Sequence, residues 1–231
     1  MHTGRNDDTK RSRTRNGIRT LPDASDKNIG FLINDNFRGF SQVDDVFCRS
    51  QYDPEIKTPH SQRFYDMYRR PLANWRNSEG YGQHDYAFRN ATWHVADIFA
   101  ELREVDDRRD GFLDPLSFLK DGPEEMVEFN SLTESSQVIK QAGKTIGADL
   151  IGITKFDSRW SYSELFSIQS LSPKPNELDD DLKNVIVIGQ SMDSELLETA
   201  PSALSGAATG MGYSQDALVL LTLSQFIRNL G

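Results

Sequence analysis

The sequence predicts a mixed α/β (α+β) fold, with an irregular and helical extension placed before an α/β domain. Three observations carry this prediction. The first 30 residues are polar and charged, and such a composition is typical of disorder. Aromatic and charged residues then interleave up to about residue 130, and from residue 131 helical apolar stripes alternate with short β-branched runs. We therefore expect a disordered basic tail (1–30), a helical and irregular extension (31–130) and an α/β domain (131–231).

The composition narrows the class of function. A net charge of -9 argues against nucleic acid as a partner, because phosphate binding needs clustered Lys and Arg. No apolar run approaches the ~20 residues of a membrane span, and the basic N-terminus is not followed by the apolar stretch of a secretion signal. These features favour a cytoplasmic protein. Cys48 is the only cysteine and the four histidines are scattered, so no disulfide, cluster or metal site is predicted from this chain alone.

Within the extension, the clearest periodicity predicts a helix over 85–105. Its apolar stripe is expected to comprise Phe88, Trp93, Val95, Ala96, Phe99 and Leu102. A shorter helix over 64–70 is expected to end at Pro71, since the residue before a proline disfavours the helical conformation. The run 40–59 shows no period and is expected to be irregular, with apolar side chains that need a partner surface: Val43, Val46 and Phe47.

The α/β domain is expected to open with a helix capped by Ser131 or Thr133 and ended by Gly147. Its buried stripe should comprise Val138, Ile139, Ala142 and Ile146. A strand follows over 148–156, then a solvated acidic loop over 173–181. A second strand over 184–192 is apolar on both faces, which is typical of a strand covered on both sides. Two strands do not make a stable sheet alone, so this domain looks unfinished.

The last predicted helix spans 201–230, and three glycines crowd its first half: Gly206, Gly210 and Gly212. Each costs about 1 kcal/mol relative to Ala in a helix interior. They would be tolerated if something bulky lies against the backbone there. The alternative is a loop that precedes a helix starting near Ser214, and the sequence leaves both open.

Five segments, in order, resemble the reductive dehalogenase family. AATGMGYSQDALVLLTLSQFIRNLG (207–231) is similar to the family's helix that opens with a GYS-type tripeptide and ends in an FIR-x-LG-type motif. Residues 139–164, with Trp160, Tyr162 and Ser163 in an aromatic–Tyr–Ser turn, resemble its preceding helix–strand unit, and 183–193 its next strand. FSQVDDVFCRSQYDPE (40–55) resembles its F-x-Q element, and 80–99 its G-Y-x-x-x-D-x-A segment. The resemblance covers about residues 35–231.

This resemblance implies a nitroreductase-like, cobalamin-binding fold that cleaves carbon–halogen bonds reductively, with electrons from two 4Fe–4S clusters. The family's catalytic tyrosine falls on Tyr213. The resemblance also places Gly210, Gly212 and Ser214 where the backbone would lie close to the flat corrin. The implied substrate is an organohalide, possibly a halogenated aromatic, and a redox partner or reductase domain would supply the electrons.

The departures from the family pattern are also informative. The cysteine runs for the clusters and the basic partner of the tyrosine are not among these residues. We therefore expect an N-terminal portion of such an enzyme, inactive by itself. The missing twin-arginine signal favours the soluble, non-respiratory branch. Two other functions stay open: an enzyme like the epoxyqueuosine reductases, with the same cofactors, and a non-enzymatic binding module.

Overall fold

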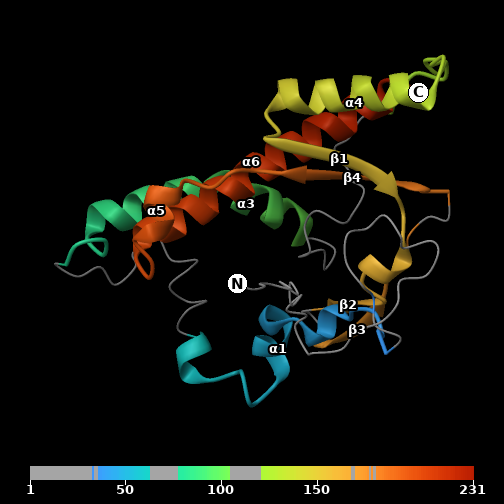
Figure 1. The fold of residues 1–231 in the computed structure, drawn as a ribbon. Helices are drawn as coiled ribbons and strands as arrows, with labels where there is room; N and C mark the ends of the chain where they lie inside the picture. Colours follow the sequence, from blue (N-terminus) through green and yellow to red (C-terminus); the bar gives the residue numbers. More distant parts are fainter. Residues whose placement is uncertain are drawn as a thin grey trace, which may run out of the picture.

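The computed structural model describes residues 33, 36–62, 78–104, 121–167, 170–176, 178 and 181–231. Its helices and strands form two groups (Figure 1). The first, here the α6 group, contains three long helices, one short helix and a two-stranded sheet. The second, here the β2 group, contains a short helix beside another two-stranded sheet. The predicted mixed α/β class is confirmed, whereas a nitroreductase-like topology stays a prediction.

Helix α6 (Ala203–Arg228) is the centre of its group. Ser202 and Ser205 form a capping box at its start, where each side chain accepts from the other's backbone N–H. The helix then runs without interruption through Gly206, Gly210 and Gly212, so the long helix is confirmed and the alternative start near Ser214 is wrong.

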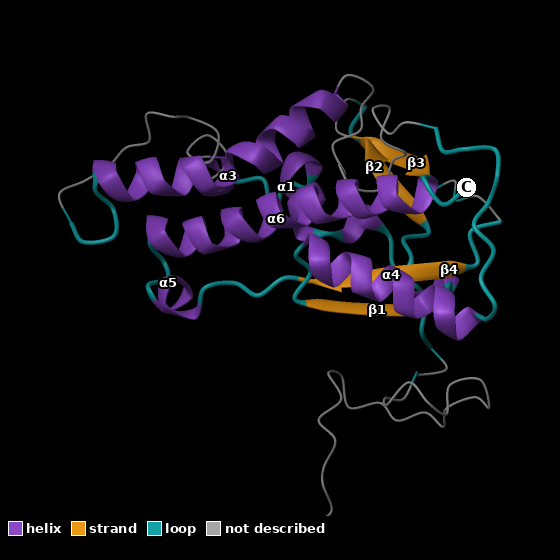
Figure 2. Cartoon of the chain, turned by 90° about the horizontal axis from the view of Figure 1, so that it is seen from above, coloured by secondary structure: helices purple, strands orange, loops and turns teal. Residues whose placement is uncertain are grey.

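Helix α3 (Gln83–Glu104) lies along α6, and the two run parallel (Figures 1 and 2). Arg89 lies against Gly206 near the start of α6, and the Ala96 amide bonds to Ser214 two turns later. The buried positions of α3 are Tyr86, Arg89, Thr92 and Ala96. The predicted stripe is therefore partly wrong, because Phe88 and Val95 are 43% and 41% exposed. Polar side chains occupy the inner face because the small residues of α6 leave room for them.

Helix α4 (Leu132–Ile146) covers another side of α6 and runs antiparallel to it, with Gly143 near Leu223 and Gly147 near Val219. Ser131 is the N-cap, since its Oγ accepts from the Glu134 amide at 3.1 Å. Gly147 ends the helix at φ +128°, a backbone region that favours glycine. The expected cap and stop are confirmed.

Strands β1 (Leu150–Lys155) and β4 (Asn184–Gly189) pair antiparallel, with Ile151 opposite Ile188. The Ile151 side chain lies against α4 at Gly143. On the other face Leu150 and Val187 are exposed. The expectation that β4 is covered on both faces is therefore wrong for the residues that the structure describes, because their helices cover one face only.

The β2 group contains the short 3₁₀ helix η2 (Gln42–Asp44), helix α1 (Val46–Tyr52), the 3₁₀ helix η3 (Ser158–Trp160) and the antiparallel strands β2 (Glu164–Ser167) and β3 (Ser172–Pro175). Two expectations are wrong here: the run 40–59 contains a helix, and the predicted loop 173–181 begins as a strand. Asp45 is the N-cap of α1, since its Oδ1 accepts from the Phe47 amide at 2.8 Å. Arg49 and Asp53 add an ion pair at its end, at 2.6 Å.

A short helix that was not predicted, α5 (Ser194–Glu198), lies beside the start of α6. The predicted tail over 1–30, the predicted helix over 64–70 and the charged run after α3 lie outside the described residues. Among the helices that the structure describes, none is both long and apolar enough to cross a bilayer. The three-part division of the chain stays a prediction, although α3 and α6, from its second and third parts, pack along one another.

Candidate functional site

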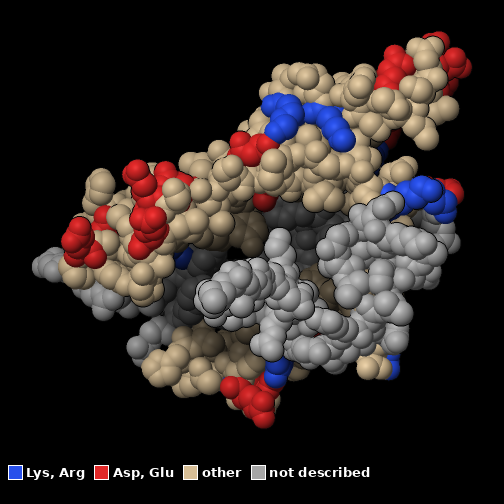
Figure 3. Space-filling model, in the orientation of Figure 1, with Lys and Arg blue, Asp and Glu red and all other residues tan. Residues whose placement is uncertain are grey.

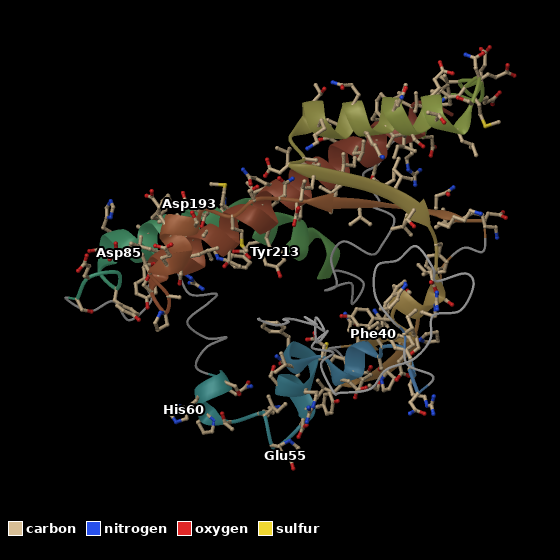
Figure 4. All side chains as sticks on the ribbon, in the orientation of Figure 1. Phe40, Glu55, His60, Asp85, Asp193 and Tyr213 are labelled. Atoms are coloured by element: carbon tan, nitrogen blue, oxygen red, sulfur yellow. The ribbon has the colours of Figure 1, made fainter. Side chains whose placement is uncertain are left out.

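Tyr213 lies in the third turn of α6 with its ring at the surface. Its side chain is 47% exposed, and it lies on the side of α6 that faces away from α4 (Figure 4). One face of the ring stacks on Trp93 of α3, with the centroids 5.1 Å apart and the planes inclined by 28°. An offset stack of this kind is a favourable aromatic arrangement. The phenol is therefore both accessible and held by a neighbour from another helix.

The indole of Trp93 is itself fixed by α6. Its Nε1–H donates to the carbonyl of Gly206 at 2.9 Å. The ring lies directly on Gly210, where a Cβ would be 2.6 Å from the indole Nε1 and 2.7 Å from Thr92 Oγ1. Only glycine permits this approach. Trp93 and Arg89 are thus the bulky groups that lie against the glycines of α6.

Ser214 follows Tyr213 and points the other way, into the interface with α3. It is 7% exposed, and its Oγ donates to the Thr92 carbonyl at 2.6 Å and accepts from the Ala96 amide at 3.2 Å. These two groups are four residues apart, the spacing of a bond within a helix. The Ser214 hydroxyl therefore bridges the turn of α3 that carries Trp93.

Gly212 faces a third partner, the loop after β4. A Cβ on Gly212 would lie 3.5 Å from Cγ of Met192, which is ordinary contact. The four predicted site residues thus share about one turn of α6, with Tyr213 exposed and Gly210, Gly212 and Ser214 buried. The buried three have packing roles here, and their assignment to cofactor contact stays a prediction.

Two further polar groups were not anticipated from the sequence. Asp216 lies one turn after Tyr213 on α6, and burial raises the pKa of its carboxyl group above the ordinary value. Gln190, just after β4, has a buried Nε2 without a hydrogen-bond partner in the structure. Sequence periodicity gave no signal for either residue. The spacing of four between Gly206, Gly210 and Ser214, in contrast, marks a ridge of small residues to which another helix can pack.

No protein-family model matches the chain. It is similar to the tetrachloroethene reductive dehalogenase of Sulfurospirillum multivorans, with 34% identity over 42% of this chain and 25% of that protein. A Desulfitobacterium hafniense protein of the same name is 32% identical, over 45% of this chain and 25% of its own length. One from Dehalobacter restrictus (strain DSM 9455 / PER-K23) is 29% identical with the same coverage. The chain resembles the reductive dehalogenases. It spans about a quarter of the length of the curated relatives it matches.

Two of the segments that carry the dehalogenase resemblance meet in the β2 group. The Ser163 amide donates to the Phe40 carbonyl at 2.7 Å, and the Phe166 amide donates to Gln42 Oε1 at 2.7 Å. Ser41 Oγ donates to Glu164 at 2.8 Å. The F-x-Q element and the aromatic–Tyr–Ser turn, more than 120 residues apart in sequence, therefore form one hydrogen-bonded unit.

Aromatic rings border this unit. Phe37 lies 5.5 Å from both Phe40 and Trp160, measured between ring centroids. Phe40 and Trp160 are each about half exposed.

A different kind of surface lies at the α5 end of the molecule, where Figure 3 shows acidic side chains gathered. Helix α5 and its cap contribute Asp193, Glu195 and Glu198.

Proposed function

We propose that this chain is the N-terminal part of a reductive dehalogenase that removes halide from an organohalide. The observation that carries the proposal is the exposed phenol of Tyr213, at the position that the family resemblance assigns to the catalytic tyrosine and held there by Trp93. The matching relatives all have the name tetrachloroethene reductive dehalogenase, which favours this function over the two alternatives above. A chlorinated alkene is then a candidate substrate beside the halogenated aromatics suggested by the sequence.

The proposed reaction replaces a carbon–halogen bond by a carbon–hydrogen bond. It consumes two electrons and one proton and releases the halide ion. We assign the proton to Oη of Tyr213, because a phenolic hydroxyl is a hydrogen-bond donor that can serve as a general acid. After transfer the phenolate must regain a proton from solvent, and the exposure of the ring permits this.

Cobalamin, proposed from the resemblance alone, would supply the electrons to the carbon–halogen bond when bound. The four predicted site residues differ in how directly they could contact cobalamin. Tyr213 is the exposed one of the four predicted site residues, so a neighbouring ligand could contact it directly. Gly210 and Ser214 are covered by α3, and Gly212 by Met192, so their support for a cofactor would be indirect, through the position of Tyr213. The 4Fe–4S clusters need cysteines, and the chain has only Cys48, so we place them in a downstream part.

The first test is to read the coding DNA beyond the codon for Gly231. The proposal expects the frame to continue into two cysteine-rich cluster motifs. A true stop with no cysteine-rich frame nearby would leave the catalytic proposal without its electron path, and the binding-module alternative would replace it.

The second test uses the complete protein, produced anaerobically with cobalamin and assayed for chloride release from tetrachloroethene with a reduced viologen dye. Tyr213→Phe should lower kcat by about 10²–10⁴-fold, the usual contribution of a general acid. Tyr81→Phe is the matched control, because it removes a phenol that is bonded to the Pro201 carbonyl instead. Full activity of Tyr213→Phe would show that the proton comes from elsewhere.

A further inference from the structure

We infer that Trp93 is the positioning residue of Tyr213: it holds the phenol ring in one orientation at the surface of α6. This inference rests on the proposed function for its catalytic meaning, but the geometry that supports it is independent of the reaction. The two residues lie 120 positions apart in sequence and on different helices, so their stack is a product of the tertiary fold.

The first step is the freedom that Tyr213 would otherwise have. An aromatic side chain that is 47% exposed on a helix can change between staggered rotamers on a fast timescale. Contact of the ring with the Trp93 indole, at 5.1 Å between centroids, opposes such changes, while about half of the residue stays exposed. A proton donor must be placed to within a fraction of an ångström to act efficiently.

The second step is that Trp93 is rigid enough for this task. Its indole cannot rotate without breaking the Nε1–H bond to the Gly206 carbonyl. Its ring rests on the bare backbone of Gly210, and its own helical turn is bridged to α6 by Ser214. Gly206, Gly210 and Ser214 of α6 therefore fix the indole. The indole in turn fixes Tyr213 on the same helix.

The third step explains the small residues of this turn. Gly210 and Ser214 flank Tyr213 in sequence but lie under α3, where larger side chains would push Trp93 away. The small residues around Tyr213 are thus explained by the space that Trp93 needs.

The test is ¹⁹F NMR of the 231-residue chain with 3-fluorotyrosine incorporated only at position 213. The stacked indole should displace the resonance from that of free 3-fluorotyrosine, through its ring current. Trp93→Leu should return the resonance to the free value and narrow it, and Trp93→Phe should leave a smaller displacement. Trp160→Leu, which removes an indole of the β2 group, is the matched control and should change nothing.

An unchanged displacement in a folded Trp93→Leu chain would overturn the inference. If Trp93→Leu does not fold, Trp93→Phe is the test. An unchanged displacement of the resonance in that variant would also overturn the inference. In the complete enzyme, Trp93→Leu should lower kcat more than tenfold with little change in KM, and Trp93→Phe should restore part of it. Full activity of Tyr213→Phe would refute the proposed role of Tyr213 while the NMR result still stands, so the two failures are distinguishable.

Discussion

The Ser214 hydroxyl on α6 donates a 2.6 Å hydrogen bond to the carbonyl of Thr92 on α3. It also accepts from the amide one turn further along α3, so a single small side chain joins the two parallel helices through backbone groups. The joint lies beside the Tyr213–Trp93 stack. Several measurable properties of the chain depend on it and on its neighbours.

Replacing Ser214 by Ala should destabilise the chain by about 1–3 kcal/mol, because the bridge is lost in a buried interface. Urea unfolding followed by far-UV circular dichroism measures this. Thr222→Ala is the matched control: its hydroxyl bonds to the Leu218 carbonyl of its own helix and is exposed, so the change should stay within about 0.5 kcal/mol. Equal effects of the two substitutions would refute the bridging role.

Two glycines in the same turn should respond to alanine in opposite directions. Gly210→Ala places a methyl group against Trp93 and Thr92 and should cost about 1–3 kcal/mol through overpacking. Gly212→Ala meets only Met192 at an ordinary distance and should gain up to about 1 kcal/mol from helix propensity. The free energies of unfolding of the two variants test this, and a tolerated Gly210→Ala would contradict the close approach of α3.

Gln42 should hold the N-terminal segment to β2. Gln42→Ala leaves the Phe166 amide without its 2.7 Å partner and should cost about 1–3 kcal/mol. Trp160 packs on Phe37, so its fluorescence during urea unfolding reports on this group when Trp75 and Trp93 are replaced by Phe. Gln51→Ala, which among the described residues loses a 3.3 Å bond to Ser50, should have a smaller effect. If both variants unfold alike, the segment is held by its aromatic contacts instead.

Asp216 should make stability depend on pH. Burial raises its pKa in the folded state above the ordinary 3.8, so the folded chain binds the proton more tightly than the unfolded chain does. Its contribution is therefore most favourable at low pH and is lost as the pH rises from about 3.8 through the folded-state pKa. Asp216→Asn should match the wild type near pH 3 and be more stable near pH 7. A constant difference across this range would exclude the effect.

The sequence predicted most of what depends on local signals. The α4 cap and stop, the two strands of the α6 group and the two long helices follow from capping residues, glycine positions and apolar runs. It missed what depends on packing. The inner face of α3 holds Arg89 and Thr92 because Gly206 and Gly210 of α6 leave room, and no periodicity of α3 alone contains that information. Helix α1 was missed because the run 40–59 has no apolar period, and its local signals are the Asp45 cap and the Arg49–Asp53 ion pair.

The same limit applies to the candidate site. The resemblance alone names Tyr213 as the candidate catalytic residue, and that role stays a prediction. Trp93 was assigned only to an apolar stripe, because its partner lies on a helix far along the chain. The spacing of four among the small residues of α6 was visible in the sequence and marks the contact face, but it does not say which helix packs there.

The parallel course of α3 and α6 has a consequence for how the chain folds. The hydrogen bonds between them join residues more than 110 positions apart, such as Trp93 and Gly206, so a long loop must close before the pair is formed. The contacts among α4, β1 and β4 close much shorter loops. We therefore expect α4, β1 and β4 to assemble first and α3 to dock late, which is slow in chains of high contact order. Until α3 docks, Tyr213 has no Trp93 ring to stack on, so the orientation of the Tyr213 ring reports the docking of α3.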